Sequence, residues 1–504
     1  MKDEFVLGLS GIGERFAVGL VRNGEVVFAV EEDKLRRFRG LGFGHLEGIG
    51  SRAVDAAVSG VPGGMRGIAR AAYVPPVDAS GDQVAGELAQ IRNFLERGYG
   101  ASPPLSAVDH VAAHLAFERA VHAGVRHVLM VGRSRAVYSG SAGEPYELDV
   151  PFSLVRGIER LAAFAGFSPA HIHHLENMAR FGEPRFGEAV EGLLGEGAGG
   201  EKLEQALEET IGFGRRLSGQ PLGQKHYDFA ASVYAVLCRR IPELLRSIPE
   251  EKRCGAVAVC GGVFQSWSLN DAVAAAFPEN RILASFAPGN AAGAIGGPLV
   301  LSGSAADAPV GPFLGPEYTR EEIKSVLDNS KARYAFHSSR DAVDRVCALL
   351  GEGKMVGWFR GRCEFGYRAL GARSVFASPA NPYACDNLSS YLKKRPAYFA
   401  YAVAIDQDDP RVAGIESPYL SRSARLPEYF GDAPVRVQTV TKPAAPDLWQ
   451  VLKAFRKSGV GALLNTSLNY FDEPIACTPR DALKTFYASG LDVLVMEGFL
   501  LTKN

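Results

Sequence analysis

The densest group of polar residues lies between Trp358 and Ser374, where arginines alternate with glycines directly after a predicted strand over residues 354–359. A helix would not tolerate so many glycines, and a solvated loop would not need them. Arginine forks beside exposed backbone N–H groups are what a phosphate or carboxylate ligand requires. We therefore favour an anion site over a plain surface loop. The arginines of this segment are Arg360, Arg362, Arg368 and Arg373.

Two other segments are candidates for the same site. Asn465 and Ser467 follow a predicted strand over residues 460–464 and supply compact polar groups, although an ordinary polar turn explains them equally well. Lys393 opens a short basic run that ends at Arg395. Such runs are more often surface than site, but this one could close the anion site.

A histidine pair in the first third of the chain has the spacing of metal ligands. His110 and His114 lie four residues apart in a predicted helix over residues 109–122. This spacing places both imidazoles on one helix face, where they can share a divalent metal. A pair of packing or surface histidines is the commoner explanation. No carboxylate close in sequence is expected on the same face.

Glycine-rich segments follow two predicted strands and are candidates for nucleotide binding. Gly261 and Gly262 come directly after a buried strand over residues 256–260 and before a helix. That order brings a backbone close to a phosphate and aims a helix N-terminus at it, although a tight turn alone is an equal explanation. A second segment carries Gly289, Asn290 and Gly293.

These residues are positioned by alternating strands and helices, which predict an α/β protein. Apolar runs flank Asn23-Gly24, a strong β-hairpin signal near the N-terminus. Residues 302–315 have no apolar periodicity and form the best linker candidate. Beyond them, Thr319 and Glu322 predict a capping box that opens a short helix. A second α/β region then runs to residue 504.

Composition excludes several classes of protein. The 504 residues carry 55 Lys+Arg against 56 Asp+Glu, a formal net charge of -1, so no basic field would attract nucleic acid or an anionic membrane. No apolar run is long enough for a membrane span, and the first residues do not resemble a signal peptide. Seven scattered cysteines without a Cys-x-x-Cys pair indicate a reducing cytoplasmic location.

Three long motifs resemble the O-carbamoyltransferases of antibiotic and nodulation-factor biosynthesis, and the resemblance extends over nearly the whole chain. They are Gly311-Pro-Phe-Leu-Gly-Pro-Glu-Tyr318, Glu364-Phe-Gly-Tyr-Arg-Ala-Leu-Gly-Ala-Arg-Ser374, and Leu464-Asn-Thr-Ser-Leu-Asn-Tyr-Phe-Asp-Glu-Pro474 continuing through Pro479.

The resemblance implies a domain order and an activity. Residues 1–310 would form an actin-like carbamoyl-transfer domain similar to the threonylcarbamoyl transferases, and residues 311–504 a YrdC-like domain. The C-terminal domain would make carbamoyladenylate from carbamoyl phosphate and ATP. The N-terminal domain would pass the carbamoyl group to a hydroxyl of a small-molecule, natural-product acceptor. It implies catalytic roles for Arg368, Asn465 and Ser467, substrate binding by Arg360, Arg362, Arg373 and Lys393, and a homodimer or a complex with a paralogue.

The chain also departs from the family pattern. The family adds two aspartates to the histidine pair, but Gly132 and Asn290 stand at those positions. Two neutral histidines and one amide make a poor site for iron or another divalent metal, and Mg²⁺ is left open. An arginine usually follows the lysine by six residues, yet Phe399 stands there. The family's polar N-terminal turn is replaced by Glu14-Arg15-Phe16.

These departures leave two main functional hypotheses, and a third possibility is a new acyl-adenylate chemistry on the same fold. The first is a diverged ATP-dependent O-carbamoyltransferase that has kept the C-terminal anion site. The second is a catalytically degenerate member that acts as the partner or regulatory subunit of an active enzyme. The intact arginine-rich loop and Asn-Thr-Ser segment favour the first hypothesis narrowly.

Overall fold

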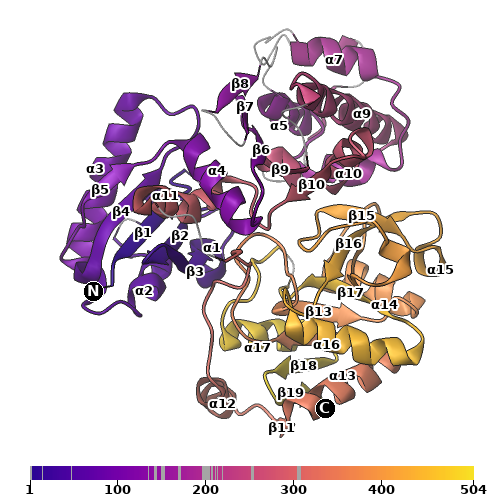
Figure 1. The fold of residues 1–504 in the computed structure, drawn as a ribbon. Coiled ribbons are helices and arrows are strands. Elements are labelled where there is room, and N and C mark those ends of the chain that lie inside the picture. The colour runs from indigo at the N-terminus through magenta and orange to yellow at the C-terminus, as the bar shows by residue number, and fades with distance from the viewer. Residues whose placement is uncertain are drawn as a thin grey trace. The chain divides into compact units, whose positions relative to one another are not determined.

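A computed structural model describes most of the chain. The described residues are 3–13, 15–46, 48–133, 135–140, 145–148, 154–168, 172–195, 205, 208–209, 212, 214–217, 219–250, 255–303, 308–470 and 472–503. Figure 1 shows the elements along the chain, with the first in indigo and the last in yellow.

The first sheet has the strand order β3-β2-β1-β4-β5. Its strands are β1 (Phe5–Ser10), β2 (Ala17–Arg22), β3 (Glu25–Glu31), β4 (Ile68–Val74) and β5 (Leu105–Ala107). β1 to β3 form an antiparallel meander, while β4 and β5 run parallel to β1. The predicted hairpin at Asn23-Gly24 is confirmed, because both residues have positive φ, as a two-residue hairpin turn requires.

The second sheet repeats this topology. Its order is β10-β9-β6-β7-β8, and its strands are β6 (His127–Val131), β7 (Ala136–Ser139), β8 (Tyr146–Leu148), β9 (Ala256–Cys260) and β10 (Arg281–Ala284). β6 to β8 are antiparallel, and β9 and β10 run parallel to β6. Two sheets of one topology are the architecture of actin-like ATPases, so the predicted fold of the N-terminal part is confirmed. The duplication is not visible as a repeat in the sequence.

Helices accompany both of these sheets. They are α1 (Glu32–Arg36), α2 (Arg52–Val58), α3 (Gly81–Tyr99), α4 (His110–Val121), α5 (Leu154–Phe164), α6 (His173–Ala179), α7 (Gly187–Gly195), α9 (Gln224–Arg246), α10 (Trp267–Ala276) and α11 (Gly293–Ser302). The sequence predicts that Pro242 disturbs the end of the helix after Asp228, but α9 continues to Arg246. Pro242 is buried with Ile241, Leu244 and Leu245, so tertiary packing outweighs the missing backbone hydrogen bond.

The third sheet has nine strands in the order β11-β19-β18-β12-β13-β17-β14-β16-β15. They are β11 (Ala335–Phe336), β12 (Val356–Phe359), β13 (Arg373–Ala377), β14 (Ala402–Asp406), β15 (Arg422–Arg425), β16 (Pro434–Val440), β17 (Ala462–Ser467), β18 (Val493–Met496) and β19 (Phe499–Thr502). The sheet mixes parallel and antiparallel neighbours. The predicted α/β class, with a YrdC-like C-terminal part, is confirmed.

Helices cover both faces of the nine-stranded sheet (Figure 1). They are α12 (Arg320–Asn329), α13 (Ser339–Gly351), α14 (Pro382–Asp386), α15 (Pro427–Phe430), α16 (Pro446–Phe455) and α17 (Pro479–Ala488). One apolar core includes buried residues of α12, α14 and α17, and a second core includes those of α13 and α16. The predicted capping box of α12 is present, since the Thr319 N–H donates to Glu322 Oε2 (2.7 Å) and the Glu322 N–H to Thr319 Oγ1 (3.2 Å).

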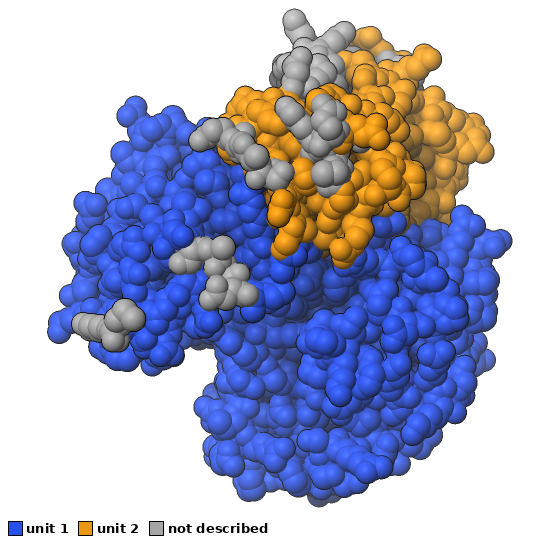
Figure 2. Space-filling model, viewed as in Figure 1, with its two compact units in different colours: residues 1–123, 290–396, 401–504 blue, residues 124–289, 397–400 orange. Residues whose placement is uncertain are grey.

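The chain divides into two compact units, which Figure 2 shows in different colours. Unit 1 contains residues 1–123, 290–396 and 401–504, and unit 2 contains residues 124–289 and 397–400. The first and third sheets therefore belong to unit 1 and the second sheet to unit 2. The boundary predicted at residue 310 lies inside unit 1 and stays a prediction. Part of the predicted linker, residues 304–307, lies outside the described residues.

Within the described ranges, no helix has the length and apolar character needed to cross a membrane.

The packing of α11 against its neighbours gives a test of unit 1. A Cβ at Gly296 would lie 1.9 Å from the backbone oxygen of Ala113 in α4, and neither backbone can yield. We expect Gly296→Ala to lower the free energy of unfolding by about 3 kcal/mol. Gly86→Ala is the matched control, because a Cβ there meets nothing within 4 Å and should stabilise helix α3 by about 1 kcal/mol. Thermal unfolding midpoints measure both; equal effects would contradict the packing argument.

Candidate functional site

The arginine-rich loop after β12 is organised by a carboxylate. Glu364 is fully buried, and its Oε1 accepts hydrogen bonds from the backbone N–H groups of Leu370 (2.9 Å), Ala372 (2.7 Å) and Arg373 (3.0 Å). A buried carboxylate needs such donors to replace its lost hydration. The loop is thus folded around its own acidic side chain.

Arg360, Arg362 and Arg373 have structural partners. Arg373 is buried, stacks 3.6 Å from the Phe359 ring centroid and donates to the carbonyls of residues 360, 361 and 372. Arg362 donates to the carbonyls of Val27 and Leu314 at 2.7 and 2.6 Å. Arg360 pairs with Asp447 (3.1 Å) and Glu497 (3.3 Å). These contacts fix the loop, and substrate binding by the three arginines stays a prediction.

Residues from the N-terminal sheet hold the same loop from the other side. Lys34 pairs with Glu31 at 2.9 Å and donates to the carbonyls of Glu364 (2.5 Å) and Gly366 (2.7 Å). The Gly366 N–H donates in turn to Glu31 (2.7 Å). Burial acts to lower the pKa of Lys34, but Glu31, Cys363 and Glu364 outweigh it and raise that pKa. Sequence reasoning missed this ion pair, because residues 31–34 resemble any charged strand end.

Arg368 and Asn465 lie near the end of the loop. Arg368 is half-buried, with its guanidinium 4.5 Å from the Tyr367 ring centroid. Asn465 is buried and donates to Gln438 Oε1 (2.8 Å), while Gln438 donates to the backbone oxygen of Leu370 (2.9 Å). Within the described residues, Asn465 Oδ1 is buried without a hydrogen-bond partner. This oxygen therefore has an unused capacity to accept a hydrogen bond.

Lys393 and Ser467 are brought together, as predicted for a shared site. Lys393 follows the π-helical turn Asn387–Leu392, and its buried ammonium donates to the backbone oxygen and hydroxyl of Ser467. It also donates to the backbone oxygen (3.0 Å) and to Oδ1 of Asn469. All four acceptors are uncharged. Burial, followed by Arg395, Arg39 and Arg37, lowers the pKa of Lys393 well below its ordinary value.

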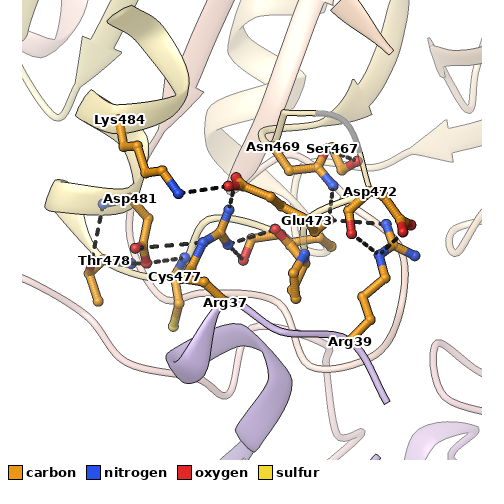
Figure 3. A network of polar contacts seen from close by, with 12 residues as sticks. Arg37, Arg39, Ser467, Asn469, Asp472, Glu473, Cys477, Thr478, Asp481 and Lys484 are labelled. Atoms are coloured by element: carbon orange, nitrogen blue, oxygen red, sulfur yellow. Dashed lines mark hydrogen bonds and ion pairs between the residues drawn. The ribbon is translucent and has the colours of Figure 1, made fainter. Parts of the chain in front are cut away.

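Two arginines from the N-terminal part, which sequence reasoning missed, reach this region. Arg37 and Arg39 follow helix α1 and contact the loop over residues 472–475 (Figure 3). Arg37 binds the Glu473 carboxylate at 2.8 Å, and Arg39 donates to the backbone oxygen of Asp472 at 2.9 Å. The sequence feature that could have indicated them is the group of three arginines at positions 36, 37 and 39, after the first hairpin.

We call these side chains the cationic cluster: Arg37, Arg39, Arg368, Lys393 and Arg395. The pKa of Arg395 is lowered to about 10 by burial and by the neighbouring Arg368 and Arg39. Cations that disfavour each other's charge in this way are stabilised by an anion, which restores favourable electrostatics. The cluster is therefore the candidate anion site.

The histidine pair fits the family's iron poorly. The rings of His110 and His114 lie 4.7 Å apart, His110 Nδ1 bonds the Pro75 backbone oxygen, and His114 Nδ1 is buried without a partner in the described part. The expectation that no carboxylate shares this face is wrong, because Glu118 lies buried one turn beyond His114. It pairs with His122 at 3.6 Å and stands two turns from His110, too far to share one ion. Among the described residues, no three His, Cys, Asp or Glu side chains could hold a metal.

The predicted nucleotide-binding residues fall in different units. Gly261, Gly262 and Gly289 belong to unit 2, and Asn290 and Gly293 to unit 1. Gly261 has φ 109°, and a Cβ there would lie 2.0 Å from the Val131 backbone oxygen. A Cβ at Gly293 would lie 2.8 Å from Ser10 Oγ. Close backbone packing accounts for both glycines, and nucleotide binding stays a prediction.

The lowered pKa of Lys393 predicts a pH dependence of stability. Between that pKa and 10.5, the ordinary value for lysine, the unfolded state binds a proton that the folded state does not. The contribution of Lys393 to the free energy of unfolding therefore rises with pH across this window. We expect Lys393→Met to be more stable than wild type below 10.5 and to lose this rise. Unfolding midpoints at a series of pH values measure it; parallel profiles for the two proteins would contradict the assignment.

The ligand set at the histidine pair predicts little bound iron. Two imidazoles that are not joined by a third ligand among the described residues hold iron weakly. Elemental analysis of protein purified without a chelator should find iron far below stoichiometric. A full complement would show that the ligand argument is wrong.

Comparisons with known proteins agree with the motifs. The family description "Carbamoyltransferase C-terminus" matches residues 347–503. The nodulation protein NolO of Bradyrhizobium diazoefficiens is 30% identical over 315 residues, which cover 57% of this chain and 57% of NolO. The 3'-hydroxymethylcephem-O-carbamoyltransferase of Amycolatopsis lactamdurans is 35% identical over 164 residues, which cover 30% of this chain and 31% of that protein. The chain spans little more than half the length of NolO.

The sequence identity to solved structures is lower than that to the relatives named above. The (R)-2-hydroxyglutaryl-CoA dehydratase component A of Acidaminococcus fermentans covers 60% of this chain and is itself covered completely (100%), with 14% identity and a TM-score of 0.39. The actin-like assignment therefore rests on the strand order of the two sheets. Residues 347–503 thus match the carbamoyltransferase C-terminal family, and the named relatives support a relationship of the chain to the O-carbamoyltransferases.

Proposed function

We propose that this protein is an ATP-dependent carbamoyltransferase that carries a carbamoyl group from carbamoyl phosphate, by way of carbamoyladenylate, to a hydroxyl of a small-molecule acceptor. The observation that carries the proposal is the cationic cluster. Its Lys393 ammonium contacts only neutral oxygens, and the open Asn465 Oδ1 lies on β17, the strand that ends at Ser467. A phosphate group and a carbamoyl amine complement these groups.

The chemistry gives each residue a role. Water releases phosphate from carbamoyl phosphate to leave carbamate, and a carbamate oxygen then attacks the α-phosphorus of ATP and displaces pyrophosphate. Lys393 and Arg368 would stabilise the charge on the phosphoryl oxygens. Asn465 Oδ1 would accept a hydrogen bond from the carbamoyl N–H, and Ser467 would keep Lys393 in position. The acceptor hydroxyl finally attacks the carbamoyl carbon, and AMP leaves.

The loop arginines have a supporting role in this proposal. Arg360, Arg362 and Arg373 hold the loop that carries Arg368, so they would act on substrate through its geometry. ATP is the implied cofactor. No step is assigned to iron, because the residues around His110 and His114 do not fit it, and Mg²⁺ stays open as a companion of the nucleotide.

A second candidate is a non-catalytic family member that binds an active paralogue. The observation that favours it is Phe399, which stands where the family has an arginine and packs 4.9 Å from His174 within unit 2. A bidentate phosphate partner is missing at that position. A protein without nucleotide-dependent stabilisation would fit this candidate.

Pyrophosphate release tests the first candidate. Wild type should release pyrophosphate only when ATP and carbamoyl phosphate are both present. Arg368→Ala should lower the rate at least about 100-fold, because one charged donor to a transition state contributes about this much. Arg22→Ala is the control, since Arg22 is exposed and pairs with Asp3 at the end of β2 in the first sheet. Wild type without release, and without a rise in melting temperature on adding ATP, would leave only the partner candidate.

A further inference from the structure

A continuous chain of hydrogen bonds joins the N-terminal arginines to Lys393. Lys393 donates to the side-chain oxygen of Asn469, and the Asn469 amide donates to the backbone oxygen of Glu473. Arg39 Nη2 donates to that same backbone oxygen at 3.0 Å. The Glu473 carbonyl thus accepts hydrogen bonds from both Arg39 and Asn469, and Asn469 in turn accepts one from the Lys393 ammonium.

The turn that presents the arginines is itself fixed. The Asp33 carboxylate accepts hydrogen bonds from the backbone N–H groups of Gly40 (2.9 Å) and Leu41 (2.8 Å). Arg37 takes the left-handed conformation at the end of α1, with φ 63°. The two arginines are therefore held in place on the N-terminal side before any ligand arrives.

Arg37 and Arg39 differ in how many of their donor groups already contact the protein. Only 12% of the Arg37 side chain is exposed, and it binds the carbonyls of Pro474 and Ile475 as well as the Glu473 and Asp481 carboxylates. Figure 3 shows it among these partners. This arginine is enclosed by its protein partners and anchors the loop.

Only part of the Arg39 guanidinium forms hydrogen bonds with the protein. Its Nε and Nη2 donate to the carbonyls of Asp472 and Glu473, and Nη1 has no hydrogen bond to any described residue. About half of the side chain, 52%, is exposed, and the carboxylate with which it pairs at 3.4 Å, that of Asp472, is 61% exposed. Solvent weakens such an ion pair. The free edge of the guanidinium is available to an anion.

We propose that Arg39 is a phosphate-binding residue that the N-terminal part contributes to the anion site of Lys393 and Arg395, with Arg37 as the residue that positions the loop between them. This proposal rests on the proposed function. It also explains how the site can bind a phosphate although Phe399 stands at the family's arginine position, because Arg39 supplies a guanidinium from another part of the chain. The ligand class is a phosphorylated small molecule, either carbamoyl phosphate or the phosphate chain of ATP.

Calorimetric binding of inorganic pyrophosphate, ATP and carbamoyl phosphate to the full chain tests the proposal. Arg39→Ala should weaken binding of pyrophosphate about tenfold, the loss expected for one charge-assisted contact. Arg39→Lys should recover part of the affinity. If Arg39 contacts the phosphate chain of ATP, ATP binding weakens with it; if it contacts carbamoyl phosphate, that ligand is the one affected. Either pattern supports the proposal.

Arg22→Ala is the matched control, because 51% of its side chain is exposed and it pairs with an exposed aspartate, as Arg39 does. It should bind all three ligands like wild type. The difference between wild type and Arg39→Ala should shrink as salt is raised, since salt screens an exposed charge. A difference independent of salt, or a shift of the unfolding midpoint for Arg39→Ala alone, would mean that Arg39 only supports the loop, and would overturn the proposal.

The outcomes for the proposal and for the function are separable. Unchanged binding by Arg39→Ala, with pyrophosphate release intact in wild type, overturns the role of Arg39 and leaves the function standing. Weakened binding by Arg39→Ala, without any release by wild type, supports the phosphate site and removes the catalytic function. Wild type that binds none of the three ligands overturns the proposal.

Discussion

The site depends on the buried carboxylate of Glu364. A carboxylate without water needs hydrogen-bond donors, and here Leu370, Ala372 and Arg373 of one loop donate their N–H groups to Glu364 Oε1. That requirement determines the path of residues 364–373, and the path places Arg373 and Arg362 among backbone carbonyls rather than toward solvent. The glycines of the loop permit the close turns; Gly366 and Gly371 have positive φ.

The same loop joins parts of the chain that are far apart in sequence. Lys34 binds its carbonyls from the N-terminal side, and Arg37 and Arg39 bind the neighbouring loop over residues 472–475. Residues from the first forty positions therefore shape a region otherwise built from the last 150. For this reason unit 1 contains residues from both ends of the chain. The C-terminal family match over residues 347–503 therefore does not include every residue of the site.

Similarity to the O-carbamoyltransferases and loss of some family residues are compatible. Among the residues that the structure describes, no three His, Cys, Asp or Glu side chains could hold a metal, so a reaction that depends on iron is not supported there. The arginine that the family has six residues after the lysine is also replaced, by Phe399, but Lys393 has other cations near it within unit 1. A phosphate site can change which segment supplies its arginines, because any guanidinium at the right distance serves, whereas a metal needs a fixed set of ligands.

The sequence by itself determined the local features: the Asn23-Gly24 hairpin, the Thr319 capping box, strand β9 and the family motifs. Turn conformation and helix capping depend on residues a few positions apart, so a single sequence contains them. Only the tertiary structure decided which arginines face backbone and which approach Lys393, that Glu364 holds the loop, and that α9 continues past Pro242. These depend on contacts between distant segments, such as Arg39 with Glu473, and the packing free energy of such contacts overrides local preference.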